Sequence, residues 1–201
     1  MSKLLLETIK CQDGQAYHLQ YHQARMDASL HTLGFLNTHI LEQLITPPDN
    51  HLYRCRVVYD AKTITVDYIP YTKRTQSTLQ LVQAHSLDYA LKYANRKELD
   101  ALFTQKKDAD DILIIKNGLV TDTSIANIAF FDGTQWLTPK EPLLHGTTRA
   151  RLLDEKKIIE AAIEPSDLVN YTEFALMNAM IGFNKIKNGI ISPIKGAHNV
   201  V

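Results

Sequence analysis

The N-terminal third of the chain switches between two hydrophobic periods. Short apolar runs around the turn-like Gln12-Asp13-Gly14 predict a hairpin, whereas apolar residues at helical spacing before Gly34 predict a helix. A second helical stretch ends at Pro47-Pro48, and two β-rich runs follow it. The predicted elements are strands over 4–10 and 16–19, helices over 21–35 and 38–45, and strands over 53–59 and 63–69.

The rest of the chain again mixes strands with helices. Residues 70–78 are polar and open with a proline, which is typical of a linker between two α/β halves. Asp132-Gly133 is the strongest short hairpin signal in the chain. The predicted elements are strands over 79–84, 112–115, 119–121, 125–131, 135–137 and 173–177, and helices over 98–107 and from Thr147. We therefore expect an α/β (α+β) chain with a small subdomain over 1–75 and a larger one over 76–201.

Composition narrows the class without indicating a function. The 201 residues carry 22 Lys plus Arg against 22 Asp plus Glu, and 45% are hydrophobic, which is ordinary globular composition without a basic surface for nucleic acid. The start reaches Glu7 too early for a secretory segment, and no apolar run has the length of a membrane span. We expect a cytoplasmic protein. Cys11 and Cys55 lack metal-ligand spacing, so we expect two small buried hydrophobes and no metal site.

Two basic candidates have both a chemical and a structural interpretation. Lys92 lies in an apolar and aromatic stretch, where burial would lower the pKa of its amine, although such lysines more often extend to the surface. His22 and Arg25 stand three residues apart on one helix face, where the guanidinium can meet an anion or remain solvated.

Two further candidates surround predicted turns. Gly146-Thr147-Thr148 opens a helix with unpaired backbone N–H groups, an arrangement that binds phosphate but also serves as a plain cap. Asp122 can pair with a buried cation or cap a turn.

The order of these residues resembles the fold-type IV pyridoxal-phosphate enzymes, the class IV aminotransferase and aminodeoxychorismate lyase superfamily. The match extends over nearly the whole chain. Its ordered segments are His22-Gln23-Ala24-Arg25-Met26, Ser29, Leu33-Gly34, Lys92-Tyr93-Ala94-Asn95-Arg96, Asp111 to Ile115, Gly118 to Asn127, Thr138-Pro139, Leu144 to Arg149 and Met177 to Gly182.

The resemblance implies a bound pyridoxal 5′-phosphate and a role for each motif. Lys92 would bind the cofactor covalently and then move protons, and Asp122, where the family has Glu, would pair with the pyridine nitrogen. Arg25, the start of the helix at Gly146, Thr147 and Thr148, and the Asn178-Ala179 turn would hold the phosphate. Asn127, Arg96 and Arg149 are expected to be structural.

The branch of the family is harder to choose. Aminotransferases of this family usually have a Tyr five residues after the lysine, where this chain has Lys97, and Lys92-x-x-x-Arg96 resembles the lyase pattern. The first hypothesis is therefore a lyase that converts 4-amino-4-deoxychorismate to 4-aminobenzoate and pyruvate. The second is an aminotransferase of a D- or branched-chain amino acid, and the third is a homologue that binds the cofactor or an anion without turnover.

The resemblance also implies partners and a place for the substrate. We expect a homodimer with the cofactor in the cleft between subdomains, a small-molecule substrate, and an outer pocket wall shortened by the early start of the chain. Arg54 and Arg56 alternate on one strand and can point the same way toward substrate carboxylates, although an exposed edge strand is an equally good interpretation. Thr8 and Tyr93 are weaker substrate candidates.

Overall fold

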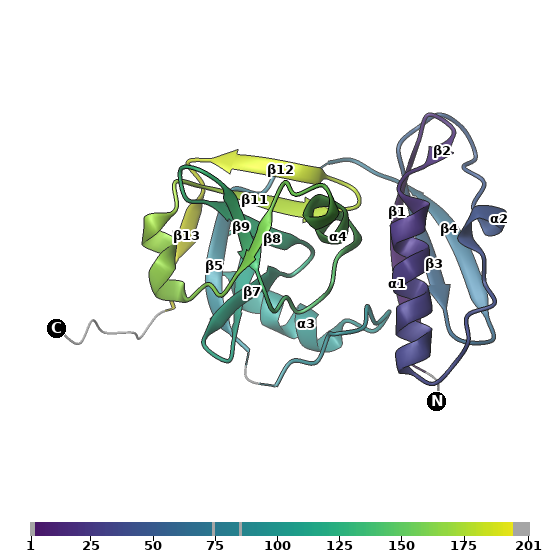
Figure 1. Cartoon of the computed structure of the whole chain (residues 1–201), viewed down its shortest axis with the longest axis horizontal. Helices are drawn as coiled ribbons and strands as arrows, with labels where there is room; N and C mark the ends of the chain where they lie inside the picture. The colour runs from purple at the N-terminus through teal and green to yellow at the C-terminus, as the bar shows by residue number, and fades with distance from the viewer. Residues whose placement is uncertain (1–2, 74, 85, 195–201) are drawn as a thin grey trace. The chain divides into compact units, whose positions relative to one another are not determined.

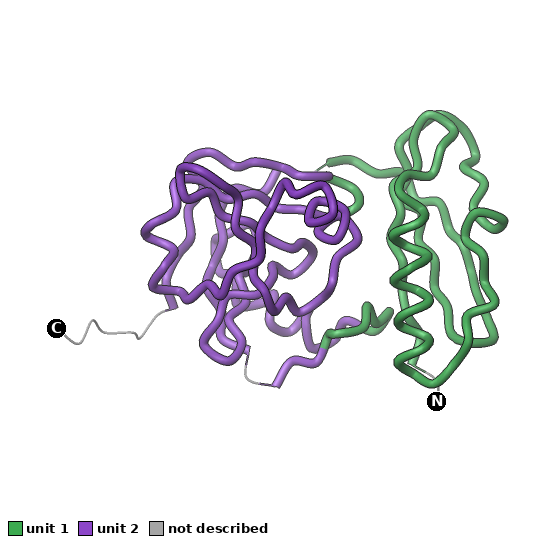
Figure 2. Tube along the Cα trace, viewed as in Figure 1, with its two compact units in different colours: residues 1–74, 89–95, 179–181 green, residues 75–88, 96–178, 182–201 purple. Residues whose placement is uncertain are grey.

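The structure, a computed structural model, describes residues 3–73, 75–84 and 86–194. The chain divides into two compact units, which are coloured separately in Figure 2. Unit 1 contains residues 1–74, 89–95 and 179–181, and unit 2 contains the remainder. No helix in the described part of the chain is long and apolar enough to cross a membrane.

Unit 1 is an antiparallel sheet covered on one face by helices. Its strand order is β2-β1-β3-β4, and α1 packs on the face that carries the apolar side chains of β1 and β3 (Figure 1). Buried and more exposed residues alternate along most of β1 and β3, and Ile9 and Val57 are buried on the helix side. The elements are β1 (Leu5–Gln12), β2 (Gln15–Ala16), α1 (Leu19–Thr32), α2 (Leu41–Leu44), β3 (Tyr53–Tyr59) and β4 (Ile64–Pro70).

Helix α1 ends where the sequence predicts. Gly34 has φ 83°, and its N–H donates to the carbonyl of His31, while the N–H of Phe35 donates to the carbonyl of Leu30, both at 2.9 Å. These two bonds form a Schellman motif, in which glycine adopts the left-handed conformation without a Cβ penalty. The helix is therefore terminated by local backbone chemistry.

The segment 89–95, which carries Lys92, is attached to unit 1 by backbone hydrogen bonds. The N–H of Leu6 donates to the carbonyl of Lys92 at 2.8 Å, and the N–H of Ala94 donates to the carbonyl of Leu4 at 2.9 Å. Together they extend the sheet beside β1. The expected division near residue 75 assigned Lys92 to the C-terminal subdomain, whereas segment 89–95 groups with unit 1. A local sequence pattern cannot predict that the chain returns to the first unit after leaving it.

Unit 2 is built around a nine-stranded mixed sheet. Seven strands follow the order β10-β9-β8-β7-β6-β5-β13, and β11 pairs with β8 and β12. Its elements are β5 (Thr78–Gln83), α3 (Lys97–Phe103), η1 (Thr104–Lys106), β6 (Asp111–Lys116), β7 (Leu119–Thr123), β8 (Asn127–Phe131), β9 (Trp136–Pro139), α4 (Thr147–Asp154), β10 (Ile159–Ala161), η2 (Pro165–Asn170), β11 (Glu173–Asn178), β12 (Gly182–Lys187) and β13 (Ile190–Ser192).

Two glycine-containing turns connect antiparallel strands of this sheet. Asn117 and Gly118 both have positive φ, as a two-residue hairpin turn requires, and they join β6 to β7. Asp132-Gly133 joins β8 to β9, which confirms the predicted hairpin. The sequence did not predict β10, β12 and β13. Two of these strands have only three residues and pair in parallel with distant partners.

Candidate functional site

A buried charge cluster on unit 1 joins strand β1 to helix α1. Glu7 of β1 is fully buried, and its Oε1 accepts a hydrogen bond from Nε of Arg25 at 2.8 Å. Its Oε2 accepts from Nη2 of Arg25 and from Nδ1 of His22, the latter at 2.6 Å. His22, Arg25 and Met26 lie on the sheet side of α1 because helical residues three or four apart share one face.

The cluster keeps its carboxylate ionised. Burial opposes ionisation of Glu7, but the Arg25 charge and the hydrogen bonds from His22 and Arg25 outweigh it and lower the pKa of Glu7 to about 2. Burial also lowers the pKa of His22. The hydrogen bond and charge of Glu7 raise this pKa and the charges of Arg25 and Lys92 lower it, but each of these effects is smaller than that of burial. His22 is therefore neutral at pH 7, and its Nδ1 carries the proton that faces Glu7.

Lys92 is half-buried in the same unit. Its backbone is fixed to β1 by the bond from Leu6, one residue from Glu7, and its charge contributes to the lowered pKa of His22. Lys92 and Arg25, two of the cations that the sequence singled out, are thus both held by contacts with β1.

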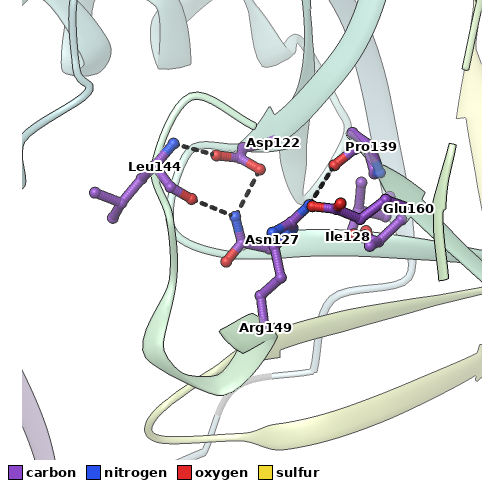
Figure 3. Close-up of polar contacts among 8 residues, drawn as sticks. Asp122, Asn127, Ile128, Pro139, Leu144, Arg149 and Glu160 are labelled. Atoms are coloured by element: carbon purple, nitrogen blue, oxygen red, sulfur yellow. Dashed lines mark hydrogen bonds and ion pairs between the residues drawn. The ribbon is translucent and has the colours of Figure 1, made fainter. Parts of the chain in front are cut away.

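Unit 2 holds a second buried carboxylate, Asp122 of β7 (Figure 3). Its Oδ1 accepts a hydrogen bond from Nδ2 of Asn127 at 2.8 Å, and its Oδ2 accepts from the N–H of Leu144 at 2.9 Å. Both donors are neutral. Burial raises the pKa of Asp122 to about 6, although these hydrogen bonds and the charge of Arg149 act in the opposite direction.

Asn127 connects this carboxylate to the start of α4. Its Nδ2 also donates to the carbonyl of Leu144 at 2.8 Å, as expected for a residue that fixes strand and loop. A Cβ on Gly146 would lie 1.9 Å from Oδ1 of Asn127, so glycine is required at the N-cap of α4. Thr147 and Thr148, which follow, are buried in the first turn of the helix.

Two arginines near these motifs have structural partners. Nη2 of Arg149 donates to the carbonyl of Pro139 at 2.8 Å and to Glu160 at 2.7 Å (Figure 3). Nη2 of Arg96 donates to the carbonyl of Ser124 at 2.9 Å. These contacts attach each arginine to the backbone of a neighbouring loop or strand within unit 2.

The remaining predicted residues are distributed over both units. Asn178 ends β11 in unit 2, where its Nδ2 donates to the carbonyl of Ile125 at 3.2 Å, and Ala179 belongs to unit 1. Tyr93 forms an isolated bridge with Leu5 beside the unit 1 sheet.

The substrate candidates of β1 and β3 share one face of the unit 1 sheet. Arg56 is half-buried and stands opposite Thr8 of β1 and Asp67 of β4, whereas Arg54 is exposed. Residues two apart on a strand share a face, so Arg54 and Arg56 do point the same way, away from the helix side that buries Cys55 and Val57.

A cavity of about 390 Å³ on unit 2 is lined by Phe130, Tyr171, Phe174 and Ile191 among other residues. It contains none of the predicted site residues. The candidate chemistry of this unit therefore lies outside it.

Glu7 is the residue that sequence reasoning missed. It alternates with Leu5, Ile9 and Cys11, all of which are buried, so the period of two already placed an acid on the core side of the strand. A buried acid requires a cation or several hydrogen-bond donors. That requirement was the available signal for a partner on the facing helix.

Comparison with known proteins identifies the family. Residues 4–188 match the family model described as amino-transferase class IV. A Haemophilus influenzae protein of uncharacterized function is 41% identical, over 89% of this chain and 98% of its own length. A Schizosaccharomyces pombe protein named "Putative aminodeoxychorismate lyase" is 27% identical, over 89% of this chain and 86% of its own.

Solved structures give the same result. The crystal structure of a "putative 4-amino-4-deoxychorismate lyase" from Haemophilus somnus superposes with a TM-score of 0.85 at 38% identity, over 90% of this chain and 98% of that one. The branched-chain amino acid aminotransferase from Escherichia coli shares the fold, with a TM-score of 0.73 at 12% identity, over 94% of this chain and 76% of that one. The fold is thus that of the fold-type IV enzymes, and the chain belongs to the class IV aminotransferase family.

Proposed function

We propose that this protein is a pyridoxal-phosphate-dependent lyase that converts 4-amino-4-deoxychorismate to 4-aminobenzoate and pyruvate. The observation that carries the proposal is the extent of the family match, because residues 4–188 include Lys92, Arg25 and Asp122. The names of the Haemophilus somnus and Schizosaccharomyces pombe relatives support the lyase over the aminotransferase. The presence of Lys97 five residues after Lys92, where the aminotransferases usually have Tyr, supports it as well.

The donor set of unit 2 fits the ring of the cofactor. Asp122 is buried beside neutral donors and has a pKa of about 6, so a protonated pyridine nitrogen would supply the positive charge that its carboxylate needs. The proposed partner of the ring is therefore Asp122. Its side chain is one methylene shorter than the family glutamate and keeps the same charge.

Each unit by itself carries groups of a kind that binds phosphate. Arg25 presents a guanidinium fixed in place, and the first turn of α4 at Thr147 and Thr148 offers backbone N–H groups at a helix N-terminus. We assign the phosphate to these residues together with Gly146, Asn178 and Ala179.

Lys92 is the proposed catalytic residue. When bound, the cofactor supplies an electron sink for the substrate carbanion. With the cofactor bound, the Nζ of Lys92 would remove the proton from C4 of the substrate ring and return it to the departing enolpyruvate as its carbon–oxygen bond breaks. Asp122 would hold the protonated pyridine nitrogen. The products, 4-aminobenzoate and pyruvate, together contain all the atoms of the substrate.

The substrate carboxylates are assigned to the polar face of the unit 1 sheet. Arg56 and Thr8 are cross-strand neighbours there, and Arg54 lies two residues along the same strand. Guanidinium groups bind carboxylates in a bidentate manner. Tyr93 bridges Leu5 and packs against the core on the helix side of the sheet, so we do not assign it to this face. The protein is proposed to act as a cytoplasmic homodimer.

A paired substrate assay tests the proposal. Supplied with 4-amino-4-deoxychorismate, the purified protein with added cofactor should release 4-aminobenzoate and pyruvate in equal amounts. Supplied with amino donors and 2-oxoglutarate, it should transfer no amino group. Amino transfer without release of 4-aminobenzoate would establish the aminotransferase instead.

The covalent link to the cofactor is tested separately. Borohydride should fix the cofactor on the wild-type protein and on Lys62→Ala, a control at an exposed turn of unit 1, but not on Lys92→Ala. A wild-type protein that stays colourless with added cofactor would rule out all the enzymatic hypotheses. Cofactor binding without either activity would leave the non-catalytic homologue.

A further inference from the structure

Glu7 contacts Arg25 in a way that fixes the plane of the guanidinium. The Nε and Nη2 groups of Arg25 donate to the two different oxygens of the Glu7 carboxylate, so the pair is bidentate along one edge of the guanidinium. Two parallel bonds restrict rotation of the group as well as its position. One N–H of Nη2 is used by Glu7. The other N–H of Nη2 and Nη1 form the outer edge of the guanidinium, which consequently points away from Glu7 in a defined direction.

His22 is oriented by the same carboxylate. Its Nδ1–H donates to Glu7 at 2.6 Å, while its Nε2 is buried and has no hydrogen-bond partner among the described residues. Glu7 is thus the side chain that determines the tautomer of His22. Three hydrogen bonds from α1 converge on one residue of β1, which ties the helix that carries Arg25 to the strand beside Lys92.

We infer that Glu7 is a positioning residue, which holds the outer edge of Arg25 in the orientation that receives the phosphate of the cofactor. This inference rests on the proposed function, since it takes Arg25 as a phosphate ligand. Glu7 neutralises the charge of Arg25, so it cannot strengthen the long-range attraction for an anion. Its contribution to binding has to come from pre-organisation, which lowers the entropy lost when the phosphate is bound.

The alternative role for Glu7 is that of a counter-ion that only stabilises the folded protein. The two roles predict opposite effects on anion affinity. If Glu7 is only a counter-ion, its removal takes a negative charge from beside Arg25 and tightens the binding of anions. If Glu7 positions Arg25, the same removal weakens the binding of phosphate.

The test compares two variants of the full-length protein with two probes. Glu7→Asp keeps the charge and withdraws the carboxylate by one methylene, whereas Glu7→Gln keeps the length and removes the charge. Pyridoxal 5′-phosphate and pyridoxal, which lacks the phosphate, are titrated by absorbance. We expect both variants to bind pyridoxal 5′-phosphate about tenfold more weakly or worse, which is the usual scale for a lost charge-assisted hydrogen bond, and to bind pyridoxal as the wild type does.

Three outcomes would overturn the inference. Equal losses for the two probes would show a general structural role, tighter binding of pyridoxal 5′-phosphate by Glu7→Gln would show a counter-ion, and an unchanged affinity in folded Glu7→Asp would show no role in binding. Thermal unfolding of each variant verifies the fold, and Glu7→Asp still decides the matter if Glu7→Gln does not fold.

A matched control and the wild type separate this inference from the proposed function. Glu155→Gln removes a carboxylate that pairs with Arg151 and Lys157 on unit 2, outside the site, and should leave both affinities unchanged. If the wild type binds no pyridoxal 5′-phosphate, the proposed function fails. If the wild type binds it and the Glu7 variants bind equally well, only the role of Glu7 fails.

Discussion

Glu7 of unit 1 and Asp122 of unit 2 are buried carboxylates with opposite electrostatics. Their side chains are exposed by 0% and 5%, yet the pKa of Glu7 is lowered to about 2 and that of Asp122 is raised to about 6. Glu7 receives two hydrogen bonds from a guanidinium, whereas the donors to Asp122 are an amide and a backbone N–H. The charge of the donor decides the direction, because burial acts in the same sense on both groups.

The difference separates a permanent charge pair from a carboxyl group that can change its protonation state. The lowered pKa of Glu7 and the raised pKa of Arg25 keep both groups ionised at neutral pH and well below it, which suits a fixed anchor. Asp122 titrates close to neutral pH, so a cation that arrives beside it stabilises its ionised form. In the proposed function that cation is the pyridine nitrogen of the cofactor.

The largest expected effect comes from removing the cation of the unit 1 pair. Arg25→Ala leaves the charge of Glu7 buried without its main partner, which should lower the free energy of unfolding by about 3–5 kcal/mol. Urea denaturation at pH 7 measures the loss. Arg151→Ala, which breaks a partly exposed pair with Glu155, should lower the free energy of unfolding far less, because solvent screens that pair. Equal losses would show that the burial of Glu7 does not matter.

The next effect is the pH dependence of stability. The folded pKa of Glu7 is below its usual 4.5, so its contribution is present above pH 4.5 and is lost as the pH falls toward 2. The folded pKa of Asp122, about 6, is above its usual 3.8, so its contribution is present below pH 3.8 and is lost as the pH rises through 6.

Asp122→Asn isolates this second contribution. In the cofactor-free protein, the variant should remove a decline of about 3 kcal/mol between pH 4 and 7, at 1.4 kcal/mol for each pKa unit. Urea denaturation at a series of pH values, with wild type in parallel, measures the decline. Persistence of the whole decline in the variant would assign it to another group.

The same variant, Asp122→Asn, should lower turnover far more than cofactor occupancy.

A smaller effect tests the hydrogen bond that steadies Asp122. Gly146→Ala places a Cβ 1.9 Å from Oδ1 of Asn127 and should push that side chain away, at a cost of about 1–3 kcal/mol. In an Asn127→Ala background the added methyl group meets no amide, so most of the extra cost should disappear. Thermal unfolding of the four proteins in this cycle gives the coupling, and additive losses would exclude this contact as the cause.

The smallest effect concerns the end of the helix that carries His22 and Arg25. Gly34 has φ 83°, so Gly34→Ala should cost about 1 kcal/mol through backbone strain. A Cβ there meets nothing within 4 Å, which removes packing as a second cause. Because the charge cluster is left intact, the pH dependence below 4.5 should match that of the wild type. A different pH dependence of the free energy of unfolding below pH 4.5 would show that helix capping and the Glu7–Arg25 pair are coupled.

Local chemistry made part of the fold predictable. Helix α1 and its end at Gly34, both hairpins of unit 1, and the Asp132-Gly133 turn all follow from periods and turn residues within a few positions of one another. Strand β13 was missed because its partner β5 lies more than a hundred residues earlier in the chain. The register between them depends on the assembled sheet rather than on the three residues of the strand.

The sequence by itself determined the family, the positions of Lys92, Arg25 and Asp122 in ordered motifs, and the helix face shared by His22 and Arg25. Only the tertiary structure decided that Glu7 is the partner of Arg25, that segment 89–95 pairs with β1, and that Asp122 has neutral donors. The reason is that a motif specifies residue types along the chain. The charge state of a buried group depends on which distant side chains the fold brings within hydrogen-bonding distance of it.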